Sequence, residues 1–301
     1  MIIATNPIRT AILASAVAVA VAAAVAFAVP VRAAEATAGD APSPSSPAPG
    51  FELSGETPAK GYVLVDRGVM VMRGGPMERR EMFETWRAPS GERWQRSIVT
   101  PADGSYRVEG EWRSDATGLR QAVRGRGAIA ADALDLAIEA QPGRSALTIR
   151  RGAREPEILD GACTPDCFVD LSPSAVAMFA MTRDARVEVG KSREFRWVGH
   201  ALNADSVLVD GVARFLRLGE QQVRRPDGSL LTVRHDVFEE NVSDLRTGFR
   251  AKVYFNLWTD TAGRPLKFAS SRTVGLREGY EDLAELAPMP RESAFPAPTA
   301  P

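Results

Sequence analysis

Histidine and cysteine are scarce in this chain of 301 residues, which contains two of each. Structural metal centres usually take four ligands from these residue types, and no histidine stands near Cys163 and Cys167 to complete such a set. A Ser-His-Asp catalytic triad would have to use His200 or His235, and neither lies near a G-x-S-x-G nucleophile elbow. The chain also has no G-x-G-x-x-G or P-loop motif after a strand. The sequence therefore predicts no metal, no cofactor and no catalytic residue.

The two cysteines stand close together, in Cys163-Thr-Pro-Asp-Cys167. In an oxidising compartment two cysteines at this spacing are expected to form a local disulfide around the proline turn. Free thiols are the main alternative, because a redox pair usually has two intervening residues and a metal site needs further ligands. We expect a Cys163–Cys167 disulfide.

Charge of one sign does not dominate the chain. The sequence has 37 basic and 38 acidic residues and a formal net charge of −1. Its arginines alternate with acids instead of clustering. A nucleic acid or other polyanion needs a basic patch, so such a partner is not indicated.

The N-terminus has the pattern of a secretory signal peptide. Arg9 precedes an apolar run over residues 11–29, and small residues then lead to Ala33. A basic region, an apolar region and a signal-peptidase cleavage site made of small residues together predict cleavage after residue 33 and export to the periplasm. An uncleaved anchor is the alternative, since about 19 apolar residues approach the length that spans a bilayer.

Composition divides the rest of the chain into three parts. Residues 34–59 are rich in Pro, Ser and Ala, and residues 288–301 have the same character. Such segments bury too little apolar surface to become ordered. We expect a flexible linker, a single β domain over residues 60–287 and a disordered tail.

Alternation of apolar and polar residues at period two dominates residues 60–287 and predicts strands with one buried face. In 249–258, Val253, Phe255 and Leu257 share one face, and Tyr254 and Trp258 share the other. Similar alternation covers residues 106–112, 134–138, 147–149 and 212–218, with turn signals at 89–91, 103–104, 226–228 and 262–265.

This pattern predicts a mainly β fold of about a dozen strands. We expect a large curved antiparallel sheet, either a half-barrel or a spiral β-roll. A closed barrel is the alternative, because closure depends on strand register that the sequence does not fix. Two stretches, 174–183 and 278–286, predict short helices.

Methionine and aromatic residues concentrate in the predicted helix 174–183 and in several strands. These side chains fill core gaps, and they also adapt to irregular apolar ligands. A curved sheet capped by such a helix could hold an amphiphile on its concave face. The candidate ligand-binding residues are Met178, Phe179, Met181, Trp197, His235, Tyr254 and Trp258.

Residues 147–173 carry a resemblance to a known family. The segments are Leu147-Thr-Ile-Arg-Arg-Gly, Leu159-Asp-Gly, the two cysteines and Val169-Asp-Leu-Ser-Pro. They resemble the middle of proteins named for glycolipid binding, which are spiral β-rolls similar to periplasmic lipoprotein-carrier half-barrels. The family's Thr-Asn-Thr-Leu-Pro run is replaced here by residues 175–181. The resemblance implies the fold and no ligand, with Asp170 and Ser172 as turn and helix-cap residues.

These features favour an exported, non-enzymatic protein that binds a lipid, glycolipid or other amphiphile on a concave sheet face. Two other interpretations stay open. The chain could be an envelope assembly module that binds another protein, or a hydrolase that uses His200 or His235. Membrane contact is expected only through residues 1–33, if that segment is uncleaved.

Overall fold

The computed structural model describes residues 61–74, 78–104, 106–114, 120–129, 132–141, 146–160, 168–171, 178–179, 187–201, 207–244 and 250–295. The expected signal peptide, the linker, Cys163, Cys167, Ser172 and Met181 lie outside these residues. The strands are β1 (Val63–Arg73), β2 (Arg79–Arg87), β3 (Arg93–Pro101), β4 (Tyr106–Ser114), β5 (Arg120–Ile129), β6 (Asp132–Gln141), β7 (Ala146–Arg151), β8 (Glu157–Leu159), β9 (Phe168–Leu171), β10 (Ser192–Ala201), β11 (Val207–Arg224), β12 (Leu230–Asp244), β13 (Arg250–Asp260), β14 (Pro265–Ala269) and β15 (Val274–Arg277).

All of these strands belong to one sheet of 15 strands, with β8 at one edge and β9 at the other. Strands β1 to β8 follow one another outward from the middle, and β15 to β9 do so on the other side. The two halves meet where β1 pairs antiparallel with β15. Every pairing is antiparallel except that of β9 with β10. The sheet is therefore a long meander whose first and last strands lie side by side at its centre.

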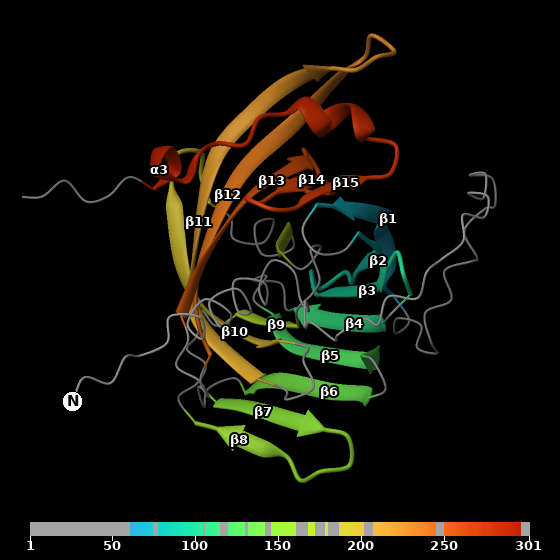
Figure 1. Cartoon of the computed structure of the whole chain (residues 1–301), viewed down its shortest axis with the longest axis vertical. Coiled ribbons are helices and arrows are strands. Elements are labelled where there is room, and N and C mark those ends of the chain that lie inside the picture. The colour runs from blue at the N-terminus through green and yellow to red at the C-terminus, as the bar shows by residue number, and fades with distance from the viewer. Residues whose placement is uncertain are drawn as a thin grey trace, which may run out of the picture.

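The sheet rolls up on itself. Strand β9 lies against β5 and β6, although these strands belong to the opposite half of the sheet. Figure 1 shows β9 inside the curve formed by β1 to β8. One edge is thus tucked against the inner face of the other half, which is the arrangement of a spiral β-roll. The predicted large, curved antiparallel sheet is confirmed.

The turns lie where the sequence predicted them. Residues 88–92 join β2 to β3, and the Pro-Asp-Gly turn joins β11 to β12. Gly228 has a φ of 83° in that turn, and its N–H donates to the Arg225 carbonyl at 2.9 Å. The side chain of Arg225 binds both carboxylate oxygens of Asp282 at 3.0 Å. This long hairpin, which projects past β13 in Figure 1, is therefore tied to the body of the protein.

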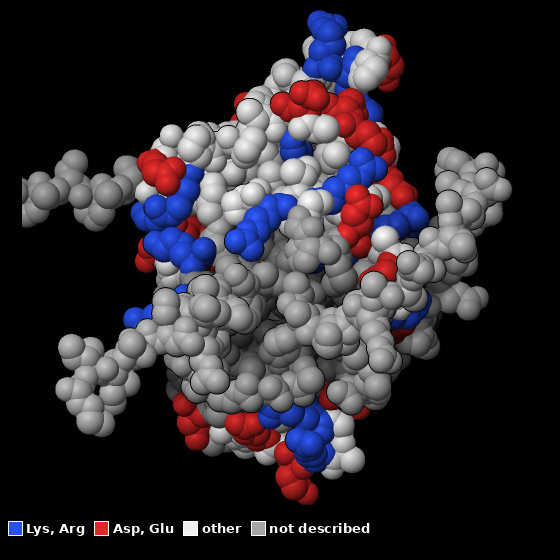
Figure 2. Space-filling model, viewed as in Figure 1, with Lys and Arg blue, Asp and Glu red and all other residues white. Residues whose placement is uncertain are grey.

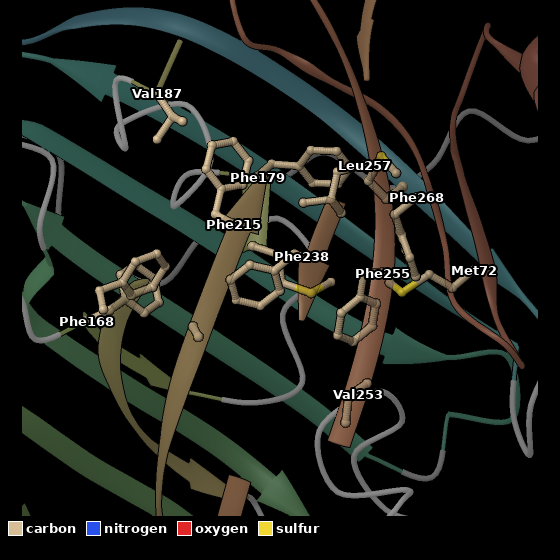
Figure 3. Close-up of a cluster of buried hydrophobic side chains, with 14 of the residues drawn as sticks. Met72, Phe168, Phe179, Val187, Phe215, Phe238, Val253, Phe255, Leu257 and Phe268 are labelled. Atoms are coloured by element: carbon tan, nitrogen blue, oxygen red, sulfur yellow. The ribbon is translucent and has the colours of Figure 1, made fainter. Parts of the chain in front are cut away.

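The main hydrophobic core lies on the concave face. It joins side chains from β1 and β2 to side chains from β9 to β14, and Figure 3 shows them gathering in one cluster. Strands so distant in the sheet can share a cluster only on the side toward which the sheet curls. Val253, Phe255 and Leu257 belong to this cluster, as their alternation predicted. Its other members are Met70, Met72, Phe83, Phe168, Met178, Phe179, Val187, Phe195, Ala213, Phe215, Phe238 and Phe268.

The C-terminal segment covers the opposite, convex face of β12 to β14. It contains the 3-10 helix η1 (Glu281–Glu285) and the short helix α3 (Arg291–Ala294). Leu283 is fully buried against Val233 and Trp258. None of the helices in the described part of the chain has the length or apolar character needed to cross a bilayer.

The ordered domain extends beyond residue 287, where the sequence placed its end. Residues 288–295 pack on the convex face, and Phe295 is only 3 % exposed. Its ring meets that of Tyr254 edge-on at 6.2 Å, and Ala294 joins it against Val237. Composition suggested disorder because the segment is rich in proline, but Ala294 and Phe295 pack on the sheet and Met289 is hydrogen-bonded to Asn256.

Candidate functional site

The expected ligand-binding residues lie on both faces of the sheet. Met178 and Phe179, which are helical as predicted, are buried in the concave core. His235, Tyr254 and Trp258 lie on the convex face, because their strand neighbours Phe238 and Phe255 point inward. These residues therefore do not form one binding surface.

Trp197 and His200 lie on β10, and the structure describes their backbones. Trp197 pairs with Gly211 of β11 and with Phe168 of β9. His200 pairs with Leu208 and with Leu171 in the same two strands. Asp170, expected to be a turn residue, instead lies in β9 and pairs with Gly199 of β10.

His235 belongs to a network that holds the C-terminal segment. Its ring stacks on Trp258 at 4.5 Å, and its Nε2 lies 2.8 Å from Oδ1 of Asn256. The Asn256 side chain accepts a bond from the Met289 N–H and donates one to the Met289 carbonyl. Burial lowers the pKa of His235, against the effect of the bond to Asn256. These contacts give His235 a structural role.

Lys267 completes this network on the far side of Trp258. Its ammonium lies 4.9 Å from the indole centroid. It donates to the carbonyls of Leu283, Ala284 and Leu286 at 3.0, 2.7 and 2.7 Å. Burial lowers the pKa of Lys267, although Glu285 opposes the shift. A buried lysine thus holds the end of η1 against the sheet.

A different set of residues forms a continuous line across the concave face of β1 to β7. These residues are directly opposite one another in successive strand pairs. All are buried. We call them the polarity row: Asp66, Thr85, Gln95, Trp112, Val123, Ile138 and Ile149.

The polarity row changes in character from one end to the other. It begins with a charged residue in the middle of the sheet, continues with two uncharged polar residues, and passes through a tryptophan. It ends with three aliphatic residues near the β8 edge. Facing side chains in adjacent strands are neighbours, so this order is a gradient of polarity along the inner surface.

The tryptophan of the row lies flat along its strand. A Cβ atom placed on Gly110 would be 2.3 Å from Cη2 of Trp112. The indole therefore covers Gly110, which is opposite Ser97 on β3 and Gly125 on β5. Glycine within a strand commonly marks such a close approach. The ring forms an aromatic surface between the polar and the aliphatic parts of the row.

Two polar atoms beside this ring have no hydrogen-bond partner among the residues that the structure describes. They are Nε2 of Gln95 and Oγ of Ser97, whose side chains share the concave face because they are two positions apart on β3. Gln95 is 4 % exposed and Ser97 is fully buried. A buried unpaired polar group costs about 1–3 kcal/mol, so buried groups in proteins are nearly always paired.

The charged residues of the concave face already have partners. Arg277 binds both carboxylate oxygens of Asp66 at 2.8 and 3.1 Å. Arg217 forms an ion pair with Asp236 at 3.2 Å. Arg79 and Glu81 each take part in at least one further interaction. Among the described residues, no group of three or more possible metal ligands is found. On the outer surface, the described acidic and basic side chains are interspersed on the face shown in Figure 2.

Sequence reasoning missed Gln95 and Ser97 and did not select Trp112. The alternation in residues 106–112 correctly placed Val108 and Trp112 on one face of β4. Nothing local shows that Gln95 lies opposite Trp112, because strand register depends on the whole sheet. The polar residues at inward positions of β3 were the only available signal.

No family model and no curated protein matches the chain. A DUF1089 family protein from Pseudomonas aeruginosa is similar in structure, with 15% identity, 65% of this chain and 92% of that chain covered, and a TM-score of 0.39. A protein with a YmcC-like fold from Bacteroides fragilis has 10% identity, with 71% of this chain and 95% of that chain covered, and a TM-score of 0.27. Likenesses at this level carry no argument about function, and the glycolipid-binding resemblance stays a prediction.

Proposed function

We propose that this chain is an exported, non-enzymatic protein that binds an amphiphile along the polarity row. The observation that carries the proposal is the row itself. It combines a graded sequence of polar, aromatic and aliphatic side chains with two buried polar atoms that lack partners. Binding sites for small apolar ligands have this composition, with few polar groups in an apolar lining.

The dimensions of the row suit a lipid-like molecule. Neighbouring strands lie about 4.8 Å apart, so the apolar part from Trp112 to Ile149 spans roughly 14 Å across three strand spacings. That length is comparable with an extended acyl chain. Trp112, Val123 and Ile138 would contact the chain, while Thr85 and Gln95 would lie beside its polar end.

The other half of the concave face does not offer a comparable surface. There the side chains of β10 to β14 pack against one another and against Phe179. This packing includes Met178, so the predicted methionine and aromatic helix contributes to the core. The proposed binding surface is accordingly on the inner face of β2 to β7, where β9 lies against β5 and β6.

The proposal is tested by titrating the purified protein with the apolar fluorescent probe N-phenyl-1-naphthylamine. Wild type should bind the probe, and Val123→Phe should weaken binding by filling the middle of the row. Val65→Phe is the control, because Val65 is exposed and is the neighbour of Asp66 in β1. Circular dichroism checks that each variant folds, and Ile149→Phe replaces Val123→Phe if that variant does not. Absence of probe binding by wild type, or equal binding by the row variant, would overturn the proposal.

A further inference from the structure

We infer that the bound amphiphile is uncharged, with a carbonyl or hydroxyl group against Gln95 and Ser97 and its apolar chain extending from Trp112 toward Ile149. This inference rests on the proposed function and specifies the ligand class and its orientation. It draws on three features of the concave face: the identity of the unpaired atoms, the pairing of the nearby charges and the order of the row.

The unpaired atoms define what the ligand must offer. Nε2 of Gln95 is a donor, and Oγ of Ser97 can donate or accept. Ester and amide carbonyls accept such bonds, and a hydroxyl can do both. A ligand with these groups would satisfy both side chains at once, which removes the free-energy cost of burying them unpaired.

The nearest described charges already have partners. Arg93, two positions from Gln95 on the same face of β3, takes part in an interaction of its own. Both oxygens of Asp66 are bonded by Arg277. The same guanidinium also donates to the carbonyls of Arg67 and Pro265 at 2.6 and 3.3 Å. An ionised headgroup placed at Gln95 would be buried without an opposite charge, which is strongly unfavourable.

The order of the row sets the orientation. Trp112 is opposite Gln95 on one side and Val123 on the other. A ligand whose polar group reaches Gln95 therefore lays the first part of its chain on the indole. Beyond it only aliphatic side chains of the row follow, at Ile138 and Ile149. The opposite orientation would place the polar group against these aliphatic residues.

The test compares two competitors with the same acyl chain. 1-Monopalmitoylglycerol is uncharged, and palmitate carries a carboxylate at pH 8. Each is titrated against the full-length protein loaded with N-phenyl-1-naphthylamine. We expect monopalmitoylglycerol to displace the probe at a concentration lower by about tenfold or more, because the buried carboxylate has no partner.

Gln95→Leu tests the polar contact. Leucine keeps the volume and removes the donor, so the affinity for monopalmitoylglycerol should fall by about 3- to 10-fold, as expected for one hydrogen bond. Probe affinity should fall less than this, because the probe has no carbonyl or hydroxyl group for Gln95 to bind, and the melting temperature should stay equal or rise, because an unpaired buried group is removed. Gln221→Leu on the exposed part of the β11–β12 hairpin is the matched control.

The outcomes separate this inference from the proposed function. If wild type does not bind the probe, both fail. If the probe binds but palmitate competes as well as monopalmitoylglycerol, only the uncharged ligand class is overturned. If Gln95→Leu lowers the melting temperature, or weakens probe and monopalmitoylglycerol equally, Gln95 has a structural role and the inference fails.

Discussion

Arg277 and Asp66 form a bidentate ion pair across the junction between the last and first strands, although 211 positions separate them in the chain. The pair is enclosed, with side-chain exposures of 12 % and 6 %. A Cβ on Gly68 would lie 2.8 Å from Phe83 and 3.0 Å from the guanidinium carbon of Arg277, so only glycine leaves room for it. This contact joins the two halves of the sheet and forms the charged end of the polarity row.

We expect Asp66→Ala to lower the free energy of unfolding by about 3 kcal/mol, because it leaves the guanidinium of Arg277 buried without its counter-charge. Arg277→Ala should have a similar effect. The double variant should lose less than the sum of the two, which urea denaturation of all four proteins would show.

The exposed pair between Arg80 and Glu278 is the internal control. It joins the same two halves of the sheet, but its side chains are 50 % and 45 % exposed. The same cycle there should give a coupling free energy below about 1 kcal/mol. Equal coupling energies at the two pairs would show that burial does not strengthen the Asp66–Arg277 contact.

We expect the free energy of unfolding to depend on pH because Asp236 is buried. Burial raises its pKa from 3.8 to about 6, although the ion pair with Arg217 opposes the shift. The folded protein therefore holds this proton more tightly than the unfolded chain. The resulting stabilisation is full below about pH 4 and is lost as the pH rises through about 6, with a total near 2–3 kcal/mol.

Asp236→Asn removes this proton linkage. The difference in unfolding free energy between the variant and wild type should shift in favour of the variant by about 2–3 kcal/mol from pH 4 to pH 7. Urea denaturation at intervals of one pH unit measures the difference. Parallel curves for the two proteins would contradict a raised pKa at Asp236.

Lys267→Met should release the C-terminal segment from the convex face. The substitution removes three hydrogen bonds, to the carbonyls of Leu283, Ala284 and Leu286, and of these the Leu283 carbonyl keeps the bond from the Leu286 N–H. We expect a loss of about 3 kcal/mol and faster hydrogen exchange over residues 281–295. Lys191→Met is the control, since Lys191 is exposed in the turn before β10. Unchanged exchange in Lys267→Met would show that the apolar contacts of Phe295 alone hold the segment.

Gly110→Ala should displace the indole of Trp112, because the new methyl group would lie 2.3 Å from the ring. We expect a loss of about 1–3 kcal/mol from overpacking and weaker binding of N-phenyl-1-naphthylamine. Gly275→Ala is the matched control, since its methyl group would lie 2.0 Å from Phe268 in the opposite half of the sheet. It should destabilise the protein and leave probe affinity unchanged. Equal affinity losses would contradict a special position for Trp112.

The strands and turns were predictable because their signals are local. Alternation assigned Val253 and Phe255 to one face of β13 and Tyr254 to the other. The Pro-Asp-Gly turn was predictable for the same reason, since Gly228 takes the positive φ that the turn requires. These patterns depend only on the strand period and on backbone sterics.

The site was not predictable, because alternation does not show which face of a sheet becomes concave. His235 and Trp258 share a face and stack, yet that face is the convex one. The polarity row depends on six successive strand registers, and the pairing of β1 with β15 depends on the whole topology. Phe295 shows the same limit, since a proline-rich composition concealed one well-placed anchor.

The most direct measurement is native mass spectrometry of the full chain, expressed with its own N-terminal segment and purified from the periplasmic fraction, followed by organic extraction. We predict a wild-type mass increased by a bound amphiphile that the extract identifies, and a reduced occupancy in Val123→Phe but not in Val65→Phe. A bare wild-type mass that does not increase when monopalmitoylglycerol is added, or equal occupancy in both variants, would contradict binding along the polarity row.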